Sequence, residues 1–110
     1  MKLLLSIILL SASQLSFAAC ESPAVPALPD GSSATQEQMI AGQQAVKQFM
    51  SLNEAYLECL TQAAQKAVDT DSKEKKQARL DQYNLSVETM QTVASDFNLA
   101  IKAWKQANAK

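Results

Sequence analysis

The sequence predicts an all-α protein, an antiparallel, coiled-coil-like hairpin of two long helices that follows an extended proline-rich arm. The prediction rests on three observations. All three prolines lie in one short stretch near the start, and two long stretches without proline come after it. Turn-forming residues separate those two stretches, and apolar residues recur in both at alternating spacings of three and four. The expected boundaries are 19–34 for the arm and 35–110 for the hairpin, with helices at about 35–68 and 73–108 and a turn at 69–72.

Residues 1–18 have the three-part pattern of a secretory signal peptide. Lys2 supplies a basic start, residues 3–10 are almost wholly apolar, and the following residues are small and polar. The apolar run is too short to span a bilayer. The sequence therefore predicts an exported protein, periplasmic or secreted.

The arm is defined by Pro23, Pro26 and Pro29. Proline at this spacing disfavours a helix and favours an extended, polyproline-like chain. The sequence Pro29-Asp30-Gly31 is typical of a turn. The arm is therefore expected to change direction there, immediately before the first helix begins.

The first helix is predicted from its cap and from one apolar seam. Ser33 or Thr35 is expected to be the N-cap, with a glutamine three residues later that closes a capping box. Asn53 is the one polar member of the seam and is expected to help fix the register of the hairpin. The seam consists of Met39, Gly42, Val46, Phe49, Asn53, Tyr56, Leu60, Ala63 and Ala67.

The second helix has the most regular pattern in the sequence. Asp71, with Glu74 three residues later, is expected to cap it. Its heptad seam is Leu80, Tyr83, Val87, Met90, Ala94, Phe97, Ile101 and Trp104. Such a seam favours near-antiparallel packing at about 20°. Folding the chain at residue 70 sets Gly42 beside Phe97, so that a small residue meets a large one.

The two cysteines, Cys20 and Cys59, leave two possibilities open. Export into an oxidising compartment favours a disulfide between them. The arm spans about 15 residues, or roughly 46 Å as polyproline, which is enough to run back along the first helix to Cys59. Alternatively, the residues before Cys20 act as a lipobox and Cys20 is acylated, which would make the protein a lipid-anchored envelope protein.

The region 20–60 resembles a set of small exported bacterial proteins of unassigned activity. The resemblance rests on Cys20 with its spaced prolines, on Pro29-Asp30-Gly31, on Met39 and Val46-Lys47, and on Tyr56-Leu57-Glu58-Cys59-Leu60. It implies a bacterial, helical and periplasmic protein, and it implies no particular chemistry.

The composition argues against an enzyme. The chain has no histidine, which is the commonest general base and zinc ligand. Removal of Lys2 with the signal leaves nine basic residues against eleven acidic ones, a net charge that does not favour nucleic acid. No catalytic, cofactor-binding or metal-binding residue is predicted, and a small-ligand or metal carrier is only the third choice.

The sequence instead favours an interaction protein that presents a helix face to a protein partner. The apolar face of the first helix is wider than one seam, so the arm or a second copy of the chain is expected to cover the additional residues. These residues are Met50, Leu52, Leu57, Cys59 and Ala64. Any contact with the membrane is expected only if Cys20 is acylated. The candidate contacts for a partner or an anion are Lys73, Lys75, Lys76, Arg79, Leu85 and Leu99.

Overall fold

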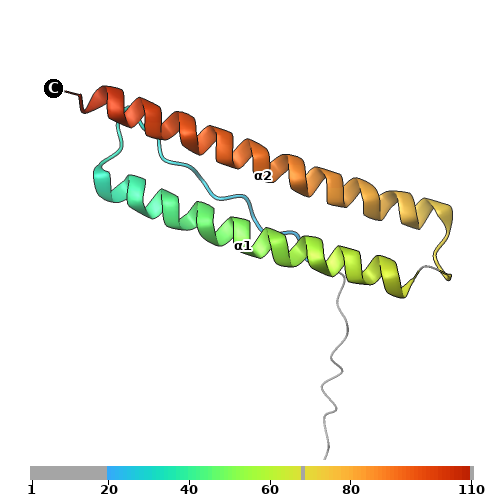
Figure 1. Ribbon diagram of the computed structural model, residues 1–110. Helices are drawn as coiled ribbons and strands as arrows, with labels where there is room; N and C mark the ends of the chain where they lie inside the picture. Colours follow the sequence, from blue (N-terminus) through green and yellow to red (C-terminus); the bar gives the residue numbers. More distant parts are fainter. Residues whose placement is uncertain (1–19, 68, 110) are drawn as a thin grey trace, which may run out of the picture.

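The computed structural model describes residues 20–67 and 69–109, and the predicted signal peptide lies outside them. It contains two helices, α1 (Gln36–Lys66) and α2 (Lys73–Ala107), which run antiparallel side by side (Figure 1). The all-α hairpin predicted from the sequence is therefore confirmed, with α1 ending two residues earlier than expected. Neither helix is long and apolar enough to cross a membrane.

The helix starts are set by side-chain caps. The Thr35 hydroxyl accepts a hydrogen bond from the backbone N–H of Gln38, and the Gln38 side chain accepts one from the backbone N–H of Thr35. This is the predicted capping box, with Thr35 rather than Ser33 as the cap. At α2 the predicted cap was wrong. Ser72 caps the helix by accepting from the backbone N–H of Lys75, because the Asp71 carboxylate is paired with Arg79 instead.

A disulfide between Cys20 and Cys59 ties the start of the arm to the middle of α1. Their Cα atoms are 5.7 Å apart, and 39 positions of sequence separate the two residues. The predicted disulfide is thus present, and it is consistent with an oxidising, extracytoplasmic compartment. With its sulfur in this bond, Cys20 has no thiol left to carry an acyl chain.

From the middle of α1 the arm runs back between the two helices toward the start of α1 (Figure 1). It approaches both helices closely. A methyl group on Gly42 of α1 would stand 2.8 Å from Cδ of Pro29 and 3.3 Å from Cε2 of Phe97. A methyl group on Gly31 would overlap the backbone carbonyl of Ala100 in α2. Both glycines are therefore required by close approach, and the expected proximity of Gly42 to Phe97 is confirmed.

The arm turns into α1 through a hydrogen-bonded loop at Asp30. Its carboxylate accepts from the hydroxyl of Ser32 at 2.6 Å and from the backbone N–H of Ser32 at 3.0 Å. The backbone carbonyl of Asp30 accepts from the N–H groups of Ser33 and Ala34. This network places Gly31 against α2 and positions the chain so that α1 begins after the Thr35 cap.

We expect the Asp30 turn to make a small, pH-dependent contribution to stability. The Ser32 hydroxyl, followed by the Ser32 backbone N–H, holds the pKa of Asp30 below its ordinary value. A carboxylate whose pKa is lower in the folded chain stabilises the fold above its unfolded pKa of about 4, and loses that effect as the pH falls through the folded pKa. An NMR titration should show Asp30 ionising below the ordinary range. In Ser32→Ala its pKa should move back up, and an unchanged pKa would contradict the assignment.

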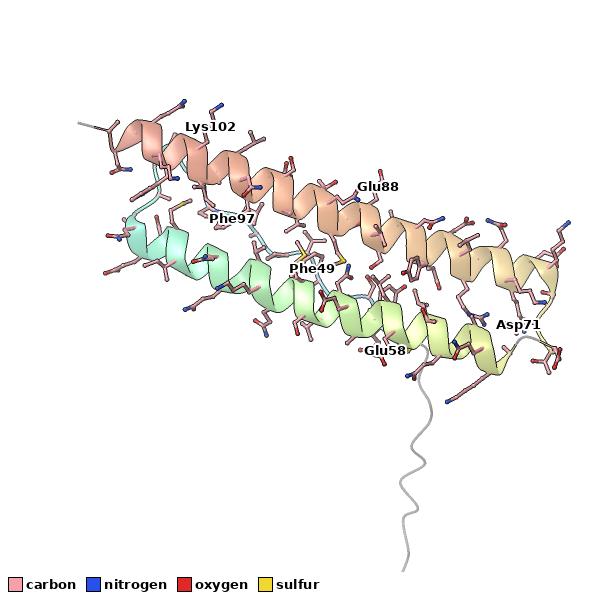
Figure 2. All side chains as sticks on the ribbon, viewed as in Figure 1. Phe49, Glu58, Asp71, Glu88, Phe97 and Lys102 are labelled. Carbon is pink, nitrogen blue, oxygen red and sulfur yellow. A yellow bond between two sulfur atoms is a disulfide. The ribbon has the colours of Figure 1, made fainter. Side chains whose placement is uncertain are left out.

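The core is a narrow strip where the helices face each other. Asn53, which is 2% exposed, donates from Nδ2 to the backbone carbonyl of Ser86 at 3.1 Å, and this bond fixes the level at which the helices meet. Phe49 and Phe97 point into the space between the helices (Figure 2). The buried apolar side chains are Met39, Phe49, Tyr56, Leu60, Val93 and Phe97.

The predicted seam of α1 is confirmed, whereas the seam of α2 was partly wrong. Leu80 and Tyr83, the first two predicted members, are 51% and 37% exposed. Ser86 and Val93, which the heptad pattern omitted, are buried instead. The arm explains this difference, because it packs on α2 at Ala100 and buries the side of the helix that carries Ser86 and Val93. The described part of the arm begins at Cys20, which the disulfide holds at Cys59, and so it does not cover the hairpin between Cys59 and the tip.

Candidate functional site

The hairpin has two long faces, and the arm occupies one of them. Two grooves on that side are lined by arm residues together with helix residues, such as Ala45 of α1 and Thr89 of α2. Two other grooves between the helices contain no arm residue. Gln43 lines one of these, two positions from Ala45 and hence about 200° around the helix from it. These two grooves therefore lie on the opposite side of the hairpin, which we call the open face.

The first open-face groove lies near the hairpin tip and has a volume of about 330 Å³. Its walls are mainly apolar, with Leu80 and Tyr83 of α2 both partly exposed to solvent. The other lining residues are Leu60, Thr61, Ala64, Lys76 and Arg79. Small residues on α1, such as Ala64, leave this groove open because they do not reach across to α2.

The second open-face groove lies at the other end of the hairpin, where the termini of the helices meet, and has a volume of about 230 Å³. Ile40, which is 48% exposed, and Trp104 are two of its apolar lining residues. The indole Nε1 of Trp104 is shielded from solvent and finds no hydrogen-bond partner within the described residues. The remaining walls are Gln36, Met39, Gln43, Phe97, Ile101 and Lys105.

An apolar strip at heptad spacing connects the two grooves. On α2 the apolar strip runs from Leu80 in the tip groove to Ile101 in the second groove. On α1 it runs from Met50 to Ala64, and the polar, exposed Gln43 occupies the next heptad position, in the second groove. Residues seven apart lie on nearly the same side of a helix. The connecting members are half-buried, and they are Met50 and Leu57 on α1 and Val87 and Ala94 on α2.

The two faces also differ in the charges that line their grooves. The open-face grooves contain the cations Lys76, Arg79 and Lys105 and no acidic residue. The arm-side grooves contain Asp30 and no cation. Arg79 is paired with Asp71, so Lys76 and Lys105 supply the unbalanced positive charge of the open face.

The six residues singled out from the sequence do not form one site. Lys76 and Arg79 line the tip groove together. Lys73 lies beside Glu74 and Asp81 in a different, outward-facing hollow, and Lys75 is exposed next to the Ser72 cap. Leu85 borders the arm-side groove with Pro23 and Val25. Leu99 is 61% exposed and lines none of these grooves.

Sequence reasoning missed the open-face residues as a site, although it noted several of them. Met50, Leu57 and Ala64 were among the five residues expected to widen the apolar face of α1, with the arm as one possible cover. The other two, Leu52 and Cys59, lie nearly opposite on α1, because each is two positions from Met50 or Leu57, and Leu52 is 51% exposed. The disulfide draws the arm to the side that carries Cys59, away from Met50, Leu57 and Ala64. The usable signal was the heptad spacing of Met50, Leu57 and Ala64 themselves.

Over residues 20–67 and 69–109, no group of three or more acidic, cysteine or histidine side chains is placed to hold a metal ion. Glu54 and Glu58 are both exposed, and Cys20 and Cys59 are joined to each other. The open face is distinguished by its shape, its apolar surface and its charge.

Comparison of the chain with protein families, with curated proteins and with solved structures gives no match. The resemblance to small exported bacterial proteins therefore stays a prediction, and the function is argued from the hairpin itself.

Proposed function

We propose that this is an exported, non-enzymatic interaction protein that presents the open face of its hairpin to a helix of a protein partner. The proposal rests on the observation that the arm covers only one side of the hairpin. The arm occupies one face, while the other keeps a heptad-spaced apolar strip that ends in two grooves. Apolar grooves that the chain itself leaves uncovered are candidate sites of protein interaction, and a groove between two helices suits a third helix.

The disulfide supports the same assignment. It holds the arm on one side of the hairpin at Cys59, and the contact of Gly31 with Ala100 holds its other end. A cover fixed in this way cannot move across to the open face without breaking these contacts. The open face is therefore kept available, and it is the surface on which we place the activity of the protein.

The other two functions considered from the sequence have less support. Acylation of Cys20 requires the thiol that the disulfide uses. A carrier of small ligands needs an enclosed cavity, and the grooves described above open to solvent along the hairpin. The tip groove is the best candidate for a small ligand, but it continues into the apolar strip and so matches an extended occupant better.

Site-specific photo-cross-linking in the cells that export the protein tests the proposal. A photo-reactive phenylalanine analogue in place of Ile40 or Tyr83, both exposed on the open face, should give one discrete cross-linked product with another envelope protein. The same analogue in place of Leu99, an exposed residue that lines none of the grooves, is the matched control and should give none. The proposal fails if Leu99 gives the same product, or if neither open-face position gives any.

A further inference from the structure

We infer that the partner helix is amphipathic and carries acidic residues near both of its ends, about 44 Å apart. This inference rests on the proposed function and specifies the chemistry of the partner. It follows from the shape of the open face and from where its cations lie. The occupant is thus a helix of a different protein that completes a three-helix bundle with α1 and α2.

The shape of the face favours one long helix. The strip follows both helices at heptad spacing, which is the pattern that accepts the apolar seam of a third helix. The grooves of about 330 and 230 Å³ at its two ends have room for large apolar side chains of the partner. Exposed Leu80 and Ile40 would be covered by such a helix, one at each end.

The charges indicate acidic partner residues. Lys76 and Arg79 line the tip groove, and Lys105 lines the groove at the opposite end. Between them, the exposed charged residues on this side of α1 are Lys47, Glu54 and Glu58, so the middle of the open face has no excess of positive charge. The positive charge of the open face is thus concentrated at its two ends, where carboxylates of a bound helix would find partners.

The spacing of these cations sets the length of the partner. Lys76 and Lys105 belong to the same helix and are 29 positions apart in the sequence. At 1.5 Å per residue this separation corresponds to about 44 Å. A partner helix of about eight turns reaches both lysines, so its acidic residues should be about 29 positions apart.

The same charges argue against two other occupants. A second copy stacked on the open face by a two-fold axis brings the Lys76 end either to the same end of its mate or to the Lys105 end. Both arrangements bring like charges together. An anionic membrane would attract the lysines, but a flat surface does not fill a groove between two helices.

Two synthetic helical peptides of about 31 residues provide the probe. Both carry one apolar seam and no tryptophan, and they differ only in having glutamates or lysines at the two ends. Trp104 is the only tryptophan of the protein and lines the open face, so its fluorescence reports binding. At low salt the glutamate-ended peptide should bind the protein about tenfold more tightly than the lysine-ended peptide does. At 0.5 M salt the difference should shrink to about threefold or less.

Charge-reversal variants locate the effect on the protein. Lys76→Glu with Lys105→Glu should invert the preference between the two peptides, because both lysines are exposed and line the open face. Lys75→Glu with Lys102→Glu makes the same change in net charge at exposed positions outside these grooves and should keep the original preference. Lys102 lies on the outer side of α2 (Figure 2).

Several outcomes would overturn the inference. Equal affinity for the two peptides, no binding of either one, or the same inversion in the control variant would each do so. Binding to anionic lipid vesicles but to neither peptide would assign the face to a membrane surface. Concentration-dependent dimerisation that is lost in Tyr83→Glu would assign it to a second copy. If the peptides bind equally while Ile40 and Tyr83 still cross-link, the proposed function stands and only the acidic partner is rejected.

Discussion

Replacement of Phe97 by alanine is expected to lower the free energy of unfolding by about 3–5 kcal/mol. Phe97 is 7% exposed and points between the helices, where it meets Gly42 and shares its surroundings with Pro29 of the arm (Figure 2). Gly42 has no side chain to fill the resulting cavity. Pro29 cannot move in freely, because the arm is fixed by the disulfide on one side and by the Asp30 turn on the other. Urea unfolding followed by far-UV circular dichroism measures the loss.

Leu99 supplies the control for this substitution. It lies two positions from Phe97 on the same helix but is 61% exposed, so Leu99→Ala should change stability by no more than about 0.5 kcal/mol. The comparison separates the cost of a cavity from the change in helix propensity. Equal losses in the two variants would show that α2 is rotated relative to the arrangement described here.

Loss of the disulfide is expected to destabilise the protein by about 4 kcal/mol. The bond closes a loop of 39 positions, and the chain-entropy treatment gives that value for a loop of this size. The variant Cys20→Ser with Cys59→Ser removes the bond and leaves no free thiol to react. The disulfide takes no direct part in the contacts between α1 and α2. Most of the helicity should therefore remain in the folded double variant.

Two further measurements check the origin of this loss. The denatured, non-reduced protein should show no free thiol, and reduction of the wild type should reproduce the stability of the double variant. Limited proteolysis should cut the double variant within residues 21–29, the part of the arm that the disulfide holds against the hairpin in the wild type. Two reactive thiols in the wild type, or a loss below about 1 kcal/mol, would contradict the role assigned to the disulfide.

The large elements of the fold were predictable because each depends on local sequence. The clustered prolines specify the arm, the Thr35 cap starts α1, and the turn residues near Asp71 separate the helices. The register of the two helices was also predictable, because two members of the α1 seam each need a particular neighbour. Gly42 needs a large side chain beside it, and Asn53 needs a hydrogen-bond partner. Gly42 accepts Phe97 and Pro29, and Asn53 bonds to Ser86.

The side of α2 that becomes buried was not predictable from its heptad pattern. A heptad pattern predicts the residues that pack on one partner helix, whereas α2 packs on both α1 and the arm. The contact of Gly31 with Ala100 turns the buried surface toward the side of Ser86 and Val93. Leu80 and Tyr83 remain exposed because the arm is held at Cys59 by its first described residue, Cys20, and does not reach the part of the hairpin nearer the tip.

The sequence by itself determined that this protein is a two-helix hairpin with an extended arm, since helix caps, proline positions and apolar periodicity act over a few residues. The sequence left two possibilities open for Cys20, and export together with the reach of the arm favoured its pairing with Cys59. Only the tertiary structure decided which face the arm covers, and hence which apolar residues stay accessible. The physical reason is that the disulfide and the close approach of Gly31 to Ala100 join segments far apart in the chain, and their combined geometry is not encoded in the periodicity of either helix.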